Sequence, residues 1–257
     1  VPNVVFRYIN QRFFVMGKEK TEEEMHTLLH NLPCCKIFAK PSTESCAKGI
    51  FILSKEENGR FAIISSNGVS LPNGNGGVIN AIRCVCEENY QFEVQLKQDS
   101  RWAQFCPDTI NTIRMLTINP SQTKEIIVAA AARFGRMGGY VDNTAQGGMA
   151  VNINICTGEL FDFGMREYDL KQYFEHPDTK CVFSHTKVPY WEDIKDLIHR
   201  VSIIMPQLKM IGWDIALTEQ GPIIVEMNTG TGVYSVQMGP KYGIADAFKE
   251  YIPTYTQ

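Results

Sequence analysis

Two acidic residues lie inside apolar, β-favouring runs near the end of the sequence. Asp214 interrupts the run Ile211–Leu217, and Glu226 ends the run Pro222–Glu226. Because removing a carboxylate from water costs several kcal/mol, such residues are usually paired or bound to a metal. Glu226 and Asn228 leave the same face of a strand, and a hairpin can bring Asp214 beside them. Three oxygen ligands of this kind predict a magnesium site, with carboxylates paired to arginines as the alternative.

A second segment has the composition of a phosphate-binding loop. A strand ends at Lys40-Pro41, a loop of small polar residues follows, and a second strand begins near Ile50. Backbone N–H groups and hydroxyls of such a loop can converge on phosphate oxygens, and a lysine at the strand end adds a positive charge. The segment differs from a P-loop because a strand, not a helix, follows it. It predicts phosphate binding at Lys40, with an ordinary turn as the alternative.

The elements that must position these residues are mainly antiparallel strands. Thr21 and Glu24 have the spacing of a capping box, which predicts a short helix that ends near Pro33. Further helices are expected over Val78–Val85 and, from a three-four apolar spacing, over Trp191–Leu208. The segments between predicted strands are more often the length of a hairpin turn than of a crossover connection. This favours antiparallel sheets and predicts an α+β protein. The expected strands are Ile37–Ala39, Ile50–Leu53, Phe61–Ser65, Phe92–Leu96, Thr112–Ile118, Glu125–Ala131, Met149–Ile153, Ile211–Leu217 and Pro222–Glu226.

Composition excludes several classes of protein. The 257 residues are 44% hydrophobic and have a formal net charge of −3, without a long Lys/Arg cluster. Nucleic acid is therefore not expected as a partner, and no apolar run approaches the roughly 20 residues of a transmembrane helix. The eight cysteines contain no zinc-type C-x-x-C pair, so reduced thiols in a cytoplasmic protein are expected.

Together these segments resemble the ATP-grasp superfamily, most closely its sugar-transfer associated proteins, over nearly the whole chain. The resemblance implies an ATP-grasp fold of two α+β lobes with mainly antiparallel sheets that enclose the nucleotide. Residues 1–97 would form the N-terminal part and the small lobe with the phosphate loop, and residues 98–257 the large lobe with the metal site. The matching segments are Lys40-Pro41 with Ala47-Lys48-Gly49, Asn111-Thr112-Ile113-Arg114, Val141-Asp142-Asn143 with Gln146-Gly147-Gly148, His176-Pro177-Asp178-Thr179, Val188-Pro189-Tyr190-Trp191 and Gly212-Trp213-Asp214.

The resemblance also implies roles for individual residues. Lys40 would contact the α- and β-phosphates of ATP, and Arg133 and Asn143 would lie near the transferred phosphate. Arg114 is a further candidate for binding an acidic substrate. The remaining implied contacts are Ser42, Ser45 and Lys48 at the β- and γ-phosphates, Gln95, Leu96 and Lys97 at adenine, and Asp214, Glu226 and Asn228 at magnesium.

Two positions depart from the family pattern. Glu44 lies in the phosphate loop, where its charge would repel a triphosphate unless the side chain points outward. Gly212 stands two residues before Asp214, where peptide-forming relatives often have an arginine. We also expect a preceding N-terminal domain to be missing, because the helix cap at Thr21 comes so early. No cysteine is expected to be catalytic, and His176 and His185 are expected to be structural or to lie at the rim of the substrate site.

The resemblance predicts an ATP-dependent carboxylate–amine ligase that acts through an acyl phosphate, in polysaccharide or glycan-linked biosynthesis. Its cofactors would be ATP and Mg²⁺, and its substrates a small-molecule or glycan carboxylate and an amine. The alternatives are a phosphotransferase with a hydroxyl acceptor and a non-catalytic ATP-binding module. The oligomeric state stays open.

Overall fold

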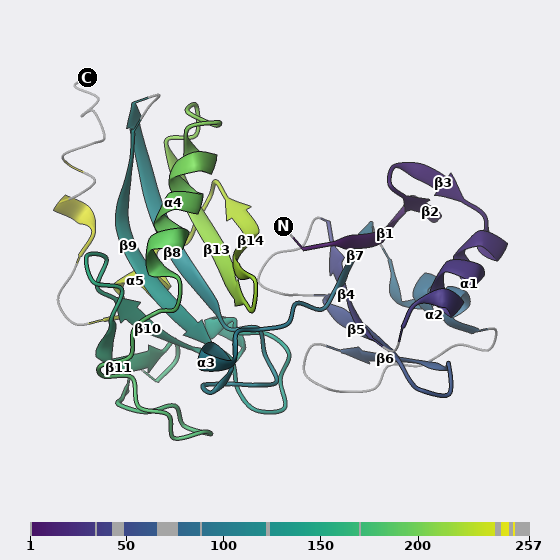
Figure 1. Cartoon of the computed structure of the whole chain (residues 1–257), viewed down its shortest axis with the longest axis horizontal. Coiled ribbons are helices and arrows are strands. Elements are labelled where there is room, and N and C mark those ends of the chain that lie inside the picture. The colour runs from purple at the N-terminus through teal and green to yellow at the C-terminus, as the bar shows by residue number, and fades with distance from the viewer. Residues whose placement is uncertain are drawn as a thin grey trace. The chain divides into compact units, whose positions relative to one another are not determined.

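The computed structural model describes residues 2–33, 35–42, 49–65, 77–87, 89–121, 124–169, 171–239, 243–246 and 249. The chain forms two compact units, which Figure 1 shows. The N-terminal unit comprises Pro2–Leu96 with Gly138–Tyr140, and the C-terminal unit comprises mainly Lys97–Met137 and Val141–Gln257. Each unit contains its own sheet and its own apolar core.

In the part of the chain that the structure describes, the N-terminal unit contains an antiparallel sheet and two helices. Its helices are α1 (Glu22–Asn31) and α2 (Gly77–Val85). Its strands are β1 (Val4–Ile9), β2 (Arg12–Val15), β3 (Lys18–Lys20), β4 (Lys36–Pro41), β5 (Phe51–Lys55), β6 (Phe61–Ser65) and β7 (Tyr90–Val94). They lie in the order β3-β2-β1-β7-β4-β5-β6, so β7 from late in the unit is inserted between β1 and β4.

The capping box at the start of α1 is confirmed. The Thr21 hydroxyl accepts a hydrogen bond from the Glu24 amide at 3.2 Å, and the Glu24 carboxylate accepts one from the Thr21 amide at 2.8 Å. Both bonds satisfy backbone donors that the first helical turn leaves unpaired. The buried face of α1, with Met25 and Leu29, joins a core in which the rings of Phe6 and Phe92 stack with centroids 4.0 Å apart.

The C-terminal unit contains a second antiparallel sheet. Its strands are β8 (Thr112–Ser121), β9 (Lys124–Phe134), β10 (Met149–Ile153), β11 (Leu160–Arg166), β12 (Gln172–Tyr173), β13 (Met210–Thr218) and β14 (Gly221–Asn228). Their order is β12-β11-β10-β9-β8-β13-β14. Its helical elements are α3 (Ser100–Ala103), a 3₁₀ turn η1 (Thr144–Gln146), α4 (Trp191–Ser202) and α5 (Tyr234–Gln237).

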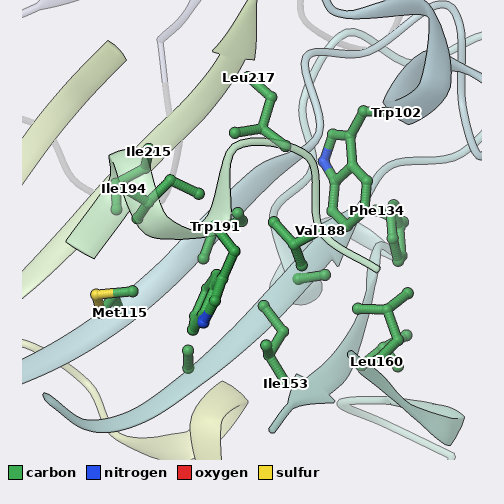
Figure 2. Packing of buried hydrophobic residues seen from close by; sticks show 14 of the residues in the cluster. Trp102, Met115, Phe134, Ile153, Leu160, Val188, Trp191, Ile194, Ile215 and Leu217 are labelled. Carbon is green, nitrogen blue, oxygen red and sulfur yellow. The ribbon is translucent and has the colours of Figure 1, made fainter. Parts of the chain in front are cut away.

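The two faces of this sheet differ in chemistry. Because side chains alternate along a strand, Met115 on β8 and Ile215 on β13 face one core, which α4 covers with Trp191 and Ile194. Figure 2 shows these side chains packed together. The intervening residues, including Arg114, leave the opposite face. A smaller apolar cluster with residues of α5 lies against other parts of β8, β9 and β10.

The structure confirms the α+β class and corrects several element boundaries. The helix expected over Trp191–Leu208 ends at Ser202, because Pro206 lacks an amide hydrogen and its ring would clash with the Ser202 carbonyl. The strand expected over Phe92–Leu96 is β7, two residues earlier. Strands β1, β2, β3, β11 and β12 were not predicted. Among the described residues, no helix is long and apolar enough to cross a membrane.

Candidate functional site

The C-terminal unit places three predicted site residues in one row across its sheet. In the strand register, Arg114 on β8 lies opposite Asp214 on β13, and Asp214 lies opposite Glu226 on β14. Arg133 on β9 lies opposite Thr112, two residues before Arg114. Residues two apart share a face, so the antiparallel pairing brings both arginines to the face that carries Asp214.

Asp214 shares its carboxylate between the two arginines. Arg114 donates from Nε to Oδ1 at 2.5 Å and from Nη2 to Oδ2 at 3.0 Å. Nη2 of Arg133 lies 3.0 Å from the same Oδ2. The side chains of Arg114, Arg133 and Asp214 are only 14%, 13% and 7% exposed. The alternative of a strand carboxylate paired to arginines therefore describes Asp214 in this structure.

Arg133 is also held by a threonine. The Thr112 hydroxyl accepts hydrogen bonds from Nε and Nη2 of Arg133 at 3.0 and 2.7 Å. The same hydroxyl donates to the buried Asp142 carboxylate, which also accepts the Thr112 amide at 2.8 Å. Burial lowers the pKa of Arg133, but the charges of Asp142, Asp214 and Glu226 outweigh it and raise that pKa above its usual value. Arg133 is therefore a fixed cation.

Arg114 is held by Thr231 in the same way. Nη1 of Arg114 donates to the Thr231 hydroxyl at 3.1 Å. That hydroxyl lies directly over Gly212, where a Cβ atom would be only 2.1 Å from it. Gly212 thus leaves room for Thr231, and β8 supplies an arginine beside Asp214. This accounts physically for the glycine two residues before Asp214.

The other two predicted metal ligands are less engaged than Asp214. Glu226 is exposed and Asn228 is half-buried, with a buried Nδ2 that has no partner among the described atoms. The described residues contain no group of three or more His, Cys, Asp or Glu side chains that could hold a metal. Magnesium, however, often uses only one or two protein carboxylates together with phosphate oxygens and water. Glu226 and Asn228 fit that smaller donor set, and Asp214 contacts the two arginines here. Magnesium binding by Asp214, Glu226 and Asn228 remains a prediction.

Asn143 lies next to this network and caps a turn. Its Oδ1 accepts the Ala145 amide at 2.9 Å at the start of η1. The preceding Asp142 approaches Nε of Arg133 at 3.5 Å. A Cβ atom on Gly148 would lie 2.6 Å from the Asp142 carbonyl oxygen, so this loop requires glycine there. The capping contact gives Asn143 a structural role, and its contact with a transferred phosphate remains a prediction.

In the N-terminal unit, Lys40 at the end of β4 is paired with a buried glutamate. Its Nζ lies 2.6 Å from Oε2 of Glu93 on β7. Ser42 donates its amide to the Asn89 carbonyl at 2.8 Å. Ser45 and Lys48, like Glu44, lie outside the described residues. Phosphate contacts of these residues stay predictions.

The segment predicted to contact adenine follows β7. The Gln95 amide extends the pairing with β4 by donating to the Lys36 carbonyl at 3.0 Å, and Leu96 is half-buried. Lys97 is 77% exposed and lies 3.0 Å from Glu219. Such an exposed ion pair contributes at most about 1 kcal/mol. Adenine binding by these three residues remains a prediction.

Sequence reasoning missed several residues of these networks. Glu93 is 5% exposed within the strand Tyr90–Val94, and the rule that singled out Asp214 applies equally to it. Thr112 and Asp142 belong to the recognised segments but had no assigned role. Thr231 carried no sequence signal, because its position depends on the chain's return over Gly212.

His176 is fully buried and contacts backbone groups of two loop segments. Its Nε2 lies 2.9 Å from the Gly135 carbonyl oxygen, and Nδ1 is approached by the amides of Asp178 and Thr179. Burial lowers its pKa, which favours a neutral imidazole. Asn111 likewise ties loops together through hydrogen bonds to the Trp102 and Cys106 carbonyls.

Two antiparallel sheets with few helices, and a buried arginine–carboxylate network on one sheet, define an α+β protein with a charged candidate site. The chain belongs to the sugar-transfer associated ATP-grasp family, which its sequence matches over residues 8–251.

Similar solved structures include two larger proteins. One is the macrocyclase MdnB from Microcystis aeruginosa MRC, at 11% identity and TM-score 0.42, covering 99% of this chain and 54% of that one. Another is the D-alanine–D-alanine ligase from Bacillus anthracis, at 12% identity and TM-score 0.42, covering 97% of this chain and 57% of that one. The chain thus spans little more than half the length of either. A comparison with curated proteins found no match.

Proposed function

We propose that the chain is an ATP-dependent carboxylate–amine ligase that acts through an acyl phosphate, in the cytoplasm, in polysaccharide or glycan-linked biosynthesis. The observation that carries the proposal is the pair of buried arginines, Arg114 and Arg133, that share the Asp214 carboxylate. Family membership supports the use of ATP. The substrates would be a small-molecule or glycan carboxylate and an amine.

The arginines have the chemistry that acyl-phosphate formation requires. A substrate carboxylate oxygen attacks the γ-phosphorus of ATP, ADP leaves, and the amine then attacks the acyl carbon and displaces phosphate. Negative charge gathers on the phosphoryl oxygens in the first step, and guanidinium donors already fixed by Asp214, Thr112 and Thr231 can stabilise it without reorganising. A guanidinium has five N–H donors, and Asp214 and Thr231 accept three of those of Arg114, so the other two can orient the acid.

The nucleotide contacts complete the proposal. Lys40, with Ser42, Ser45 and Lys48, would neutralise and orient the phosphates, and Gln95, Leu96 and Lys97 would contact adenine. Magnesium, when bound, would offset the charge of the phosphates, and Glu226 and Asn228 are the residues available to hold it. Asn143 would assist Arg133 near the transferred phosphate.

Isotope transfer from the carboxylate to phosphate tests the mechanism. The protein is incubated with ATP, Mg²⁺, amino acids and sugar acids labelled with ¹⁸O in the carboxylate, and amino sugars as amines. A ligase releases ADP and inorganic phosphate that contains ¹⁸O, because the attacking oxygen leaves with the phosphate. A phosphotransferase yields ADP and a stable phosphorylated alcohol, and a binding module yields neither; both results contradict the proposal.

A further inference from the structure

A chain of polar contacts crosses the sheet of the N-terminal unit and ends at Lys40. Arg7 on β1 donates from Nε to Oε1 of Gln91 at 2.9 Å. Gln91 on β7 donates from Nε2 to Oε1 of Glu93 at 2.7 Å, and Lys40 on β4 donates from Nζ to Oε2 of Glu93 at 2.6 Å. Both oxygens of the Glu93 carboxylate are thus engaged by residues on β7 and β4.

The burial of the two partners is unequal. The Glu93 side chain is 7% exposed, whereas that of Lys40 is 31% exposed. A buried carboxylate requires a charged partner, because leaving it unpaired costs several kcal/mol. Lys40 supplies that charge while part of its side chain remains accessible to a ligand. Glu93 is therefore the fixed member of the pair and Lys40 the accessible member.

We infer that Glu93 is the positioning residue for Lys40, fixing its ammonium group at the end of β4 to receive an anionic phosphate. A lysine side chain has four rotatable bonds, and restricting them on ligand binding costs conformational entropy. The Glu93 contact imposes that restriction before any ligand arrives. An ammonium has three donors, so one can remain on Glu93 while others reach phosphate oxygens.

This inference rests on the proposed nucleotide role of Lys40 and makes a specific prediction about coupling. If Glu93 acts through Lys40, its substitution matters only while Lys40 is present. The variant Glu93→Gln keeps the shape of the side chain but loses its charge. ATP affinity should then fall about tenfold, which is the effect expected from the loss of one charge-assisted hydrogen bond. The double variant with Lys40→Ala should bind ATP no more weakly than Lys40→Ala alone.

Calorimetric titration of the full chain with ATP and Mg²⁺ tests this, using wild type, Glu93→Gln, Lys40→Ala and the double variant. The matched control is Glu19→Gln, which alters the exposed pair of Arg12 and Glu19 in the same unit and should leave affinity unchanged. Glu93→Asp keeps the charge on a shorter side chain and should recover part of the lost affinity. Thermal unfolding of each variant separates a loss of fold from a loss of binding.

The outcomes separate the two levels of the proposal. Wild type that does not bind ATP overturns both the nucleotide role and the inference. Wild type that binds ATP, with equal affinity in Glu93→Gln, overturns the inference alone. Additive losses in the double variant also overturn it, because Glu93 would then act independently of Lys40. If Glu93→Gln does not fold, equal affinities of Glu93→Asp and wild type would overturn it.

Discussion

Arg114 binds the Asp214 carboxylate through two parallel hydrogen bonds, although 100 residues separate the two side chains in the sequence. Their strands pair in register, so each side chain leaves the sheet directly beside the other. A second guanidinium, that of Arg133, approaches one of the same oxygens at 3.0 Å. The two guanidinium cations are thus fixed among three carboxylates, those of Asp142, Asp214 and Glu226, whose charges keep Arg133 protonated.

Replacing Arg114 with lysine should reduce activity while the charge is kept. Lysine cannot reproduce the two parallel bonds to Asp214 or the bond to Thr231. We expect kcat to fall about 10–100-fold, because one oriented donor for developing charge is lost. Steady-state ADP release checks this, with Arg12→Lys, a 65% exposed position, as the matched control. Unchanged kcat in Arg114→Lys would contradict the role given to the guanidinium.

Magnesium dependence should distinguish Glu226 from Asp214. Glu226→Gln removes the exposed carboxylate that is available to a metal, so the Mg²⁺ concentration for half-maximal activity should rise about tenfold. Asp214→Asn instead leaves two buried arginines without their anion and should lower the free energy of unfolding by about 3–5 kcal/mol. Metal titrations and chemical denaturation of both variants measure these effects. The reverse pattern would show that Asp214 is the principal metal ligand.

Gly212→Ala should destabilise the C-terminal unit by steric overlap. The new Cβ would lie 2.1 Å from Oγ1 and 2.5 Å from Cβ of Thr231. Overpacking of this kind costs about 1–3 kcal/mol, which denaturant unfolding can measure. The double variant with Thr231→Gly should recover part of the loss caused by Gly212→Ala. Gly232→Ala, where no atom lies within 4 Å of the added Cβ, is the control. A Gly212→Ala variant as stable as wild type would refute the packing argument.

The pair formed by Arg136 and Asp178 should make stability depend on pH in the acid range. Hydrogen bonds from Arg136, at 2.6 Å to each carboxylate oxygen, lower the pKa of Asp178 from 3.8 to about 2. Because the pKa of Asp178 is lower in the folded state than in the unfolded state, its ionised carboxylate stabilises the fold at pH values above the unfolded-state pKa. This contribution is lost as pH falls from about 4 to about 2. At about 1.36 kcal/mol per pKa unit, it amounts to about 2 kcal/mol.

Urea unfolding at a series of pH values measures that dependence. Asp178→Asn should lose stability mainly at neutral pH and show a smaller change between pH 5 and pH 2 than wild type. Asp246→Asn, at a carboxylate that is 93% exposed, is the control. Parallel pH profiles for wild type and Asp178→Asn would contradict the assignment.

Local sequence signals were sufficient for much of the fold. Thr21 and Glu24 identify the start of α1, and the strand Met149–Ile153 was predicted with both of its ends. Short strands such as Lys18–Lys20 were missed because three polar residues have no apolar alternation. Their pairing depends on neighbours that local patterns do not identify.

In the candidate site, too, local sequence signals identify some residues but not their partners. An acidic residue within an apolar strand identified Asp214 as a paired or metal-bound carboxylate, but composition could not choose between the two. The arginine contacts depend on strand register, which brings Arg114 and Arg133 beside Asp214, and metal binding by Asp214 remains a prediction. The roles of these residues in catalysis and of Lys40 in phosphate binding remain predictions.

The pairing of β8 with β13 also has a consequence for synthesis on the ribosome. Strands β8 and β9 can pair as a hairpin soon after both are synthesised. The other hydrogen-bonding edge of β8 stays unpaired until β13 has been synthesised. With 100 residues between Arg114 and Asp214, translation at 5–20 residues per second leaves that edge uncovered for about 5–20 s. Unpaired strand edges promote association between chains. The nascent protein therefore passes through an interval in which one edge of β8 is open to association, and Arg114 lacks its carboxylate partner until Asp214 emerges.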